Sequence, residues 1–198
     1  VDPELARGLP PEVTATTGMD ALTQLLESFV SPRATPVTDA LCRKGLARAA
    51  RALRRAFRNG SDLSAREDMA LASLFGGIAL ANAGLGAVHG LAAPLGGMFS
   101  APHGAVCAAL LAPTVRANLA ALRARASHSP AIARYGEAAE ILTGRKGATG
   151  EDGAAWMAAL ARDLEIPALS AWGAREKDFE EIARKAASSR SMKGNPAP

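Results

Sequence analysis

Aromatic residues are scarce in this sequence, and runs of β-branched residues are missing. Phe, Trp and Tyr make up only 4% of the 198 residues, although 48% of the chain is hydrophobic. Strands favour β-branched and aromatic side chains, so the composition gives no sign of a sheet. Alanine dominates the hydrophobic residues. Helices that pack closely through small side chains fit this composition, and the length suits one ordinary domain.

Cysteine is nearly absent as well. The two cysteines, Cys42 and Cys107, have no C-x-x-C spacing, which excludes the usual cysteine zinc motifs. Both stand in alanine-rich helical contexts and are expected to be reduced, buried small residues. No signal peptide opens the chain and no run of about 18 apolar residues is evident. We therefore expect a cytoplasmic protein without a membrane partner.

A large excess of charge is also lacking, since the net charge is only +4. Most of the excess arginine lies in RKGLARAARALRRAFR, residues 43–58. Nucleic-acid binding would call for interleaved aromatic residues or a known motif, and neither is present. Leu46, Ala50 and Leu53 recur there at helical spacing, which predicts a solvated helix face. An anionic partner is the alternative, and no nucleic-acid partner is expected.

Apolar periodicity, capping residues and turn signals predict seven or eight helices and no strand. Thr14 or Thr17 is expected to cap the first helix, and Ser64 with Glu67 to form a capping box on the third. Residues 1–13 are expected to be an extended leading segment. The predicted helices cover residues 18–31, 36–57, 65–83, 102–126, 130–142, 151–164 and 175–187. The fold class is therefore all-α, with residues 1–198 forming a single multihelical domain.

Two of the three histidines lie in a glycine-rich stretch, AVHGLAAPLGGMFSAPHGA, residues 87–105. Gly96 and Gly97 are expected to break the helical pattern, so that the chain folds back and brings His89 close to His103. Glycines on both sides of His89 let another backbone or a ligand approach. One histidine alone is usually an ordinary core or surface residue, but two that converge are candidate metal ligands.

Acidic and amide side chains share one face of the first predicted helix, in GMDALTQLLES. Asp20 and Gln24 are four residues apart, and Glu27 has roughly the same azimuth. Asp20 falls in the first turn of that predicted helix, where an acidic residue stabilises the helix dipole. Periodicity alone does not decide between this role and a functional one.

Three segments together resemble the iron-containing (group III) alcohol dehydrogenases of the dehydroquinate-synthase-like superfamily. They are GLPPEVTATTGMDALTQLLES, GAVHGLAAPLGGMFSAPHGAVCAALL and SMKGNP, and the resemblance covers essentially the whole chain. It implies a protein with an N-terminal α/β domain that binds NAD(P) and a C-terminal helical domain that holds a divalent metal between the two. This chain resembles the second domain only. The N-terminal NAD(P)-binding domain and a short final helix are expected to be absent from it.

The resemblance also implies a set of metal ligands. The family's aspartate and two signature histidines correspond to Asp20, His89 and His103. The family's further histidine is replaced by Gln24, which would be a weak fourth ligand or a hydrogen-bonding group beside the site. The metal would be Fe²⁺ or Zn²⁺, bound less tightly than with a histidine at position 24, or the site would prefer a harder ion. Ala93 stands where the family often has another histidine, so no catalytic acid or base is assigned.

By this resemblance, the full enzyme would oxidise an alcohol to an aldehyde or ketone with NAD(P), with the metal as Lewis acid. The 198-residue chain alone is expected to be inactive, because hydride transfer needs the dinucleotide-binding domain. A metal-independent oxidoreductase similar to maleylacetate reductase is one alternative. A non-catalytic helical module for interaction or oligomerisation is another, and a homodimer is compatible with either.

Overall fold

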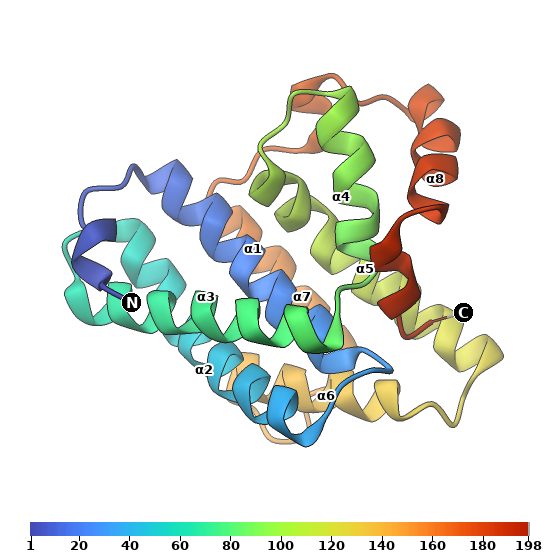
Figure 1. Ribbon diagram of the computed structural model, residues 1–198, viewed down its shortest axis with the longest axis horizontal. Helices are drawn as coiled ribbons and strands as arrows, with labels where there is room; N and C mark the ends of the chain where they lie inside the picture. Colours follow the sequence, from blue (N-terminus) through green and yellow to red (C-terminus); the bar gives the residue numbers. More distant parts are fainter. Residues whose placement is uncertain (198) are drawn as a thin grey trace.

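The computed structural model describes residues 1–197, and within this range every regular element is helical (Figure 1). The prediction of an all-α fold is confirmed. The α-helices are α1 (Pro11–Val30), α2 (Pro36–Arg58), α3 (Leu63–Ala83), α4 (Ala87–Met98), α5 (His103–Arg125), α6 (Pro130–Thr143), α7 (Gly150–Asp163) and α8 (Phe179–Ala187). Short 3₁₀ turns are η1 (Pro3–Ala6), η2 (Leu169–Trp172), η3 (Glu176–Asp178) and η4 (Arg190–Gly194).

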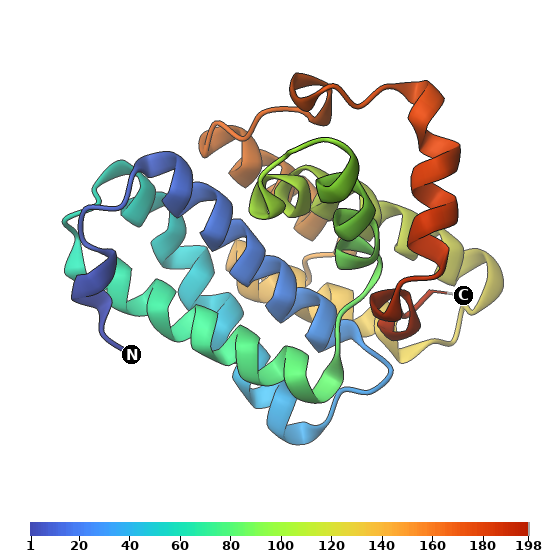
Figure 2. The ribbon, with the colours of Figure 1, turned by 45° about the horizontal axis from the view of Figure 1, so that its top comes forward.

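Helix α1 lies at the centre of the molecule, between the α2–α3 pair and the α4–α5 pair (Figures 1 and 2). Met19, Leu22, Leu25 and Phe29 of α1 are fully buried. Burying each such side chain stabilises the fold by about 1.5–3 kcal/mol. Packing on several sides therefore fixes the position of α1 in the fold.

Small residues allow α1 and α2 to approach closely. A Cβ atom at Gly18 of α1 would overlap Leu53 of α2, and one at Gly45 of α2 would overlap Leu25 of α1. This reciprocal packing of leucine on glycine agrees with the helix contacts expected from the composition.

The arginines of α2 are paired with carboxylates of neighbouring helices. Asp68 of α3 accepts from Arg48 and from Arg51, whose Nη2 lies 2.6 Å from the Asp68 oxygen. Arg54 is 2.7 Å from Asp163 of α7. The basic side chains of residues 43–58 thus lie on a partly exposed helix face, as predicted, and several of them also form ion pairs with carboxylates of other elements.

Helix α1 begins earlier than predicted. Pro11 occupies the first helical turn, where a backbone N–H would have no partner within the helix, so the missing N–H of proline costs nothing there. Residues 11–13 are therefore helical and not extended. Pro3–Ala6 form the 3₁₀ turn η1. Thr17, predicted as a cap, lies inside α1 and donates its hydroxyl to the carbonyl of Val13 at 2.7 Å. The prediction of an extended leading segment over residues 1–13 is therefore wrong.

The start of α3 also differs from the prediction. Asp62 caps the helix, and its side chain accepts from the backbone N–H of Ala65 at 3.0 Å. Ser64 is already helical, so the predicted capping box of Ser64 and Glu67 is wrong. Aspartate is among the strongest N-cap residues, and it stands two positions earlier.

The glycine pair does not break the chain where the sequence suggested. Gly96 and Gly97 are both inside α4, and the reversal occurs over residues 99–102, where Ser100 has φ of 27°. A helical glycine costs only about 1 kcal/mol, which packing can offset. A second bend lies before α4, where Gly84 adopts φ of 74° and the axes of α3 and α4 diverge by 102°.

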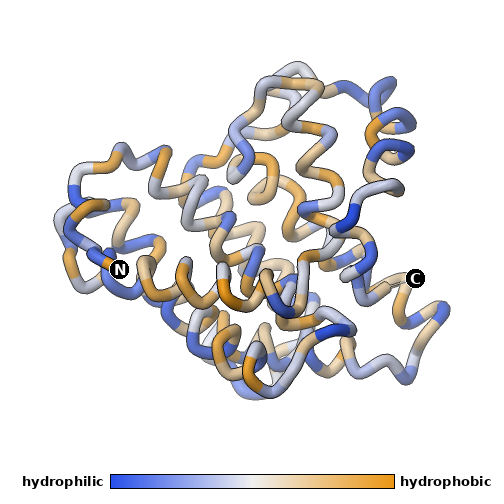
Figure 3. The backbone as a smooth tube through the Cα atoms, viewed as in Figure 1, coloured by the Kyte–Doolittle hydropathy of each residue, from blue (hydrophilic) through white to orange (hydrophobic). Residues whose placement is uncertain are grey.

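The C-terminal region folds back over α4. Helix α8 is largely hydrophilic (Figure 3) and packs on α4 through the buried side chains of Ile182 and Ala186. After η4, Asn195 accepts a hydrogen bond from Asn118 of α5 at 2.9 Å. The same oxygen accepts from the backbone N–H of Ala87 at 3.4 Å. The tail therefore holds the beginning of α4 against α5.

Helix α5 is long and apolar enough to cross a membrane by length and composition, although no such apolar run was expected from the sequence. In the structure, 61% of its most apolar window is buried among the other helices. It contacts α1, α4 and α7. Its apolar character is accounted for by this core position.

Candidate metal centre

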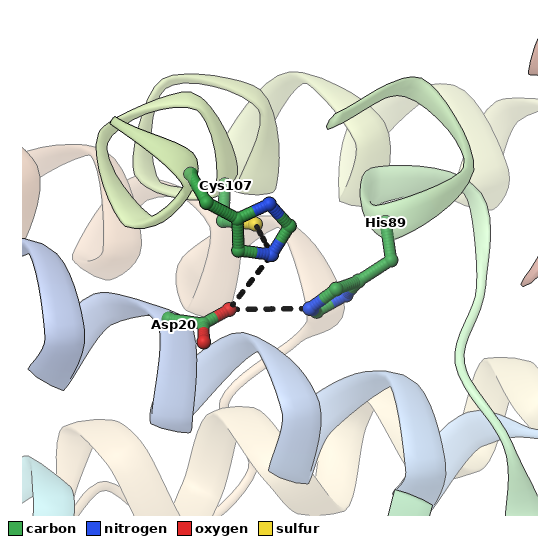
Figure 4. Close-up of side chains that lie close together, drawn as sticks. Asp20, His89 and Cys107 are labelled. Atoms are coloured by element: carbon green, nitrogen blue, oxygen red, sulfur yellow. Dashed lines mark hydrogen bonds and ion pairs between the residues drawn. The ribbon is translucent and has the colours of Figure 1, made fainter. Parts of the chain in front are cut away.

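Three helices bring Asp20, His89 and His103 together, although they are distant in sequence. Oδ1 of Asp20 lies 3.1 Å from Nε2 of His89 and 3.6 Å from Nε2 of His103. The two imidazole rings have centroids 5.4 Å apart. Figure 4 shows Asp20 on α1 directed toward His89 on α4.

Asp20 does not serve the helix dipole. It lies more than two turns inside α1, which starts at Pro11. The dipole effect falls off within the first turn, so the placement of Asp20 in a first turn is wrong. Its partly buried carboxylate faces the two imidazoles instead.

A glycine at the start of α5 lets His103 reach Asp20. A Cβ atom at Gly104 would overlap the backbone carbonyl of Thr16 on α1. Backbone cannot move aside as a flexible side chain can, so α5 touches α1 here only because residue 104 lacks a Cβ.

His89 is buried and held on its far side by Glu27. Nδ1 of His89 lies 2.6 Å from Oε2 of Glu27, and Oε1 of Glu27 accepts from the backbone N–H of Val88 at 2.7 Å. Metal-binding histidines characteristically place a carboxylate on the other ring nitrogen. The helical spacing predicts that Glu27 has roughly the azimuth of Asp20, but it predicts no function for this residue. Its spacing of two helical turns from Asp20 was the available signal.

The groups around His89 stabilise the protonated, positively charged form of its imidazole. Burial opposes protonation of His89, but hydrogen bonds with Asp20, Cys107 and Glu27 outweigh burial and raise the pKa of His89 to about 12. Burial also works to raise the pKa of Asp20, yet its hydrogen bond to His89 and the nearby imidazoles lower that pKa overall. Carboxylates are thus arranged around a position suited to a cation.

Gln24 holds the second oxygen of the Asp20 carboxylate. Its Nε2 donates to Oδ2 of Asp20 at 2.8 Å. Its Oε1 is directed toward Gly76 of α3, 3.2 Å from the place of a Cβ there. Of the two roles left open by the sequence, this geometry supports the hydrogen-bonding one. Ala93 is exposed on α4 and offers no side-chain donor or acceptor.

Cys107 belongs to the same cluster. One ligand atom from each of Asp20, His89, His103 and Cys107 lies within 4.8 Å of all the others. Cys107 Sγ lies 3.5 Å from Nε2 of His103, and Figure 4 shows its sulfur beside the cluster. The alanine-rich helical context predicts only a buried, reduced cysteine at this position. Its position one turn after His103 was the available signal.

These residues fit a divalent cation by donor chemistry and by spacing. A carboxylate with two imidazoles is a donor set that zinc and ferrous iron accept. Metal–ligand bonds of about 2.0–2.2 Å in tetrahedral geometry place oxygen and nitrogen ligands ~3.3–3.5 Å apart. The distances of Asp20 to the histidines, 3.1 and 3.6 Å, bracket that value. The side chain of His103 is 53% exposed, so the cluster opens to the surface.

Comparison with known proteins shows which family this chain belongs to. The profile of the Fe-containing alcohol dehydrogenase family, C-terminal, matches residues 14–198. Alcohol dehydrogenase 4 of Schizosaccharomyces pombe is 42% identical over 91% of this chain and 41% of its own length. The 1,3-propanediol dehydrogenase of Klebsiella pneumoniae is 40% identical over 98% of this chain and 50% of its own length.

A solved structure shows the same likeness in three dimensions. The crystal structure of a 1,3-propanediol oxidoreductase superposes on all of this chain with a TM-score of 0.89 and 39% identity, and the match covers 51% of that protein. The chain thus spans about half the length of the relatives it matches. It belongs to the iron-containing alcohol dehydrogenase family and corresponds to the C-terminal helical part of its members.

Proposed function

We propose that this chain is the metal-binding half of an NAD(P)-dependent dehydrogenase that oxidises an alcohol to an aldehyde or ketone. The observation that carries the proposal is the convergence of Asp20, His89 and His103 from three helices on one point. Fe²⁺ or Zn²⁺ is the ion that this donor set suits. The names of the relatives indicate alcohols and short diols as the substrate class.

Each residue then has a distinct task. Asp20 supplies negative charge to a dication, and His89 and His103 bind through neutral imidazole nitrogens. Glu27 fixes the ring of His89, and Gln24 fixes the carboxylate of Asp20. When bound, the cation supplies Lewis-acid polarisation of the alcohol oxygen, and the nicotinamide supplies the hydride acceptor. The exposed edge of His103 marks the side from which an alcohol can approach.

The partner that this chain requires is an N-terminal dinucleotide-binding domain, in accord with the half-length match to the relatives. The two unpaired cysteines suit a reducing cytoplasm. On this proposal, the chain supplies the metal ligands and the dinucleotide-binding domain supplies the binding site for nicotinamide.

The test compares the chain with a protein in which it follows a dinucleotide-binding domain. The longer protein should reduce NAD(P)⁺ in the presence of an alcohol, lose this activity on chelation, and regain it with Fe²⁺ or Zn²⁺. Asp20→Asn should remove the metal-dependent activity. Activity that survives both chelation and Asp20→Asn would instead support the alternative of a metal-independent oxidoreductase.

A further inference from the structure

We propose that Cys107 binds the metal as a thiolate, so that the protein ligands are Asp20, His89, His103 and Cys107. This inference rests on the proposed metal site and specifies its fourth ligand. On binding, the bond between Sγ and its hydrogen breaks, a bond between Sγ and the metal forms, and the proton leaves to solvent.

The position of the sulfur fits a metal ligand. Bonds of about 2.3 Å to sulfur and 2.0–2.1 Å to nitrogen in tetrahedral geometry place the two ligand atoms ~3.5 Å apart. Sγ of Cys107 lies 3.5 Å from Nε2 of His103, the same nitrogen that faces Asp20. All four ligand atoms fall within one 4.8 Å cluster.

Gln24 is turned away from this role. A carboxylate oxygen only accepts hydrogen bonds, so the side of the amide that faces Asp20 must be the NH₂ group. That NH₂ donates to Oδ2 of Asp20 at 2.8 Å, and an NH₂ group cannot bind a cation. The amide oxygen is directed to Gly76 on α3. The fourth donor is therefore supplied by α5.

The second cysteine provides an internal comparison. Cys42 and Cys107 are both completely buried and both free. The ionisable groups around Cys42 are Asp39, Arg43 and Arg134, and no imidazole is among them. Of the two cysteines, Cys107 alone has its sulfur within 4.8 Å of a carboxylate oxygen and of two imidazole nitrogens. Core packing accounts for Cys42 but leaves the surroundings of Cys107 unexplained.

A thiolate changes which ions the site selects. Together with Asp20 it brings two negative charges, which neutralise a dication, whereas Gln24 would bring none. Thiolate and imidazole ligands suit Zn²⁺, Fe²⁺ and Co²⁺, while Mg²⁺ and Mn²⁺ prefer oxygen ligands. The site should therefore reject the harder ions that a glutamine ligand would favour. Four protein ligands still permit substrate binding, because catalytic zinc sites can expand to five ligands.

Cobalt binding to the 198-residue chain tests the proposal, because Co²⁺ reports ligation by its spectrum. The chain titrated with Co²⁺ should develop visible d–d bands together with a near-ultraviolet charge-transfer band from sulfur to cobalt. Cys107→Ser keeps the size of the side chain. It should lose the charge-transfer band and bind Co²⁺ at least about tenfold more weakly, as removal of even an outer-shell partner costs 10–100-fold. Cys42→Ala is the matched control and should keep both the band and the affinity.

The outcomes separate this proposal from the metal site itself. Visible bands without a charge-transfer band, or a charge-transfer band that persists in Cys107→Ser, would overturn the thiolate ligand and leave the site of Asp20, His89 and His103 standing. Absence of any Co²⁺ spectrum, with no protection of the chain against heat by Co²⁺ or Zn²⁺, would overturn both. Thermal unfolding of apo Cys107→Ser shows whether that variant is folded. If it is not, Cys107→Ala provides the same comparison.

Discussion

Among single residues, Glu27 is expected to govern metal affinity without touching the metal. Its carboxylate holds Nδ1 of the buried His89 and is itself held by the backbone N–H of Val88. Glu27→Gln keeps the shape but weakens this hold on the ring. Loss of such a partner typically lowers metal affinity about 10–100-fold. Competition of the chain with a chromophoric Zn²⁺ chelator measures the effect.

The matched control is Glu12→Gln, an exposed position on the same helix. It removes an equal charge from α1 at a distance from the cluster, so its affinity for Zn²⁺ should match the wild type. If Glu27→Gln and Glu12→Gln bound Zn²⁺ alike, the carboxylate of Glu27 would have no part in holding His89 for a metal.

Sequence reasoning found part of the cluster and missed another part for physical reasons. Asp20, His89 and His103 were named through the family resemblance, and the structure brings them together. The contacts of Glu27 and Cys107 depend on which face of α1 and α5 meets α4, which periodicity within one helix does not reveal.

Among the elements, the contact between α1 and α5 is expected to depend on Gly104. Gly104→Ala would drive a Cβ into the backbone of Thr16, so the start of α5, with His103, must move outward. Overpacking of this kind costs about 1–3 kcal/mol. Urea unfolding should show the loss of stability, and Zn²⁺ binding should weaken as His103 leaves Asp20.

Gly77→Ala is the control for this substitution, because Gly77 is exposed on α3 with open space around it. Its higher helix propensity should leave the stability equal or raise it by about 0.5–1 kcal/mol. Zn²⁺ affinity should be unchanged. Equal stability and equal Zn²⁺ affinity in Gly104→Ala and Gly77→Ala would show that α5 does not need this close approach.

Thr149 and Asp152 form a capping box at the start of α7, and this box is expected to make the free energy of unfolding fall at acid pH. The pKa of Asp152 is lowered from 3.8 to about 2, first by the backbone N–H of Thr149, then by the Thr149 hydroxyl and by Arg145. A lowered pKa gives stability that is present above the unfolded value and is lost as pH falls toward the folded value. Thermal unfolding should therefore show a loss from about pH 4 to pH 2 that is smaller in Asp152→Asn. Parallel curves for the two proteins would contradict this role.

The elements show where local signals suffice. Apolar periodicity located seven of the eight α-helices within residues 1–197, and α4 (Ala87–Met98) was not predicted because its glycines were expected to interrupt the helical pattern. The start of α1 was missed because Pro10 and Pro11 looked extended, although proline is favoured in a first turn. The break expected at Gly96 and Gly97 lies instead at residues 99–102, and α4, which packs on α5 and α8, continues through both glycines.

On the scale of the whole molecule, a central helix carries the acidic residues of the site and two later helices deliver the imidazoles and the thiol. Helix α1 is packed on several sides, and the C-terminal segment fastens α4 through Asn195. The cluster therefore belongs to the fold of this half alone, although the chain spans half the length of its relatives. The isolated chain should bind metal even where it performs no hydride transfer.

The most direct measurement is the metal content of the chain purified without chelator. Wild type should hold about one divalent ion per chain, as expected for a single cluster of ligands. His103→Ala should hold nearly none while keeping the helical circular dichroism, because this side chain is half exposed and contributes little to the core. His128→Ala, which alters the exposed third histidine, should keep its metal. A wild-type chain without metal, or a His103→Ala chain with undiminished metal, would contradict the account.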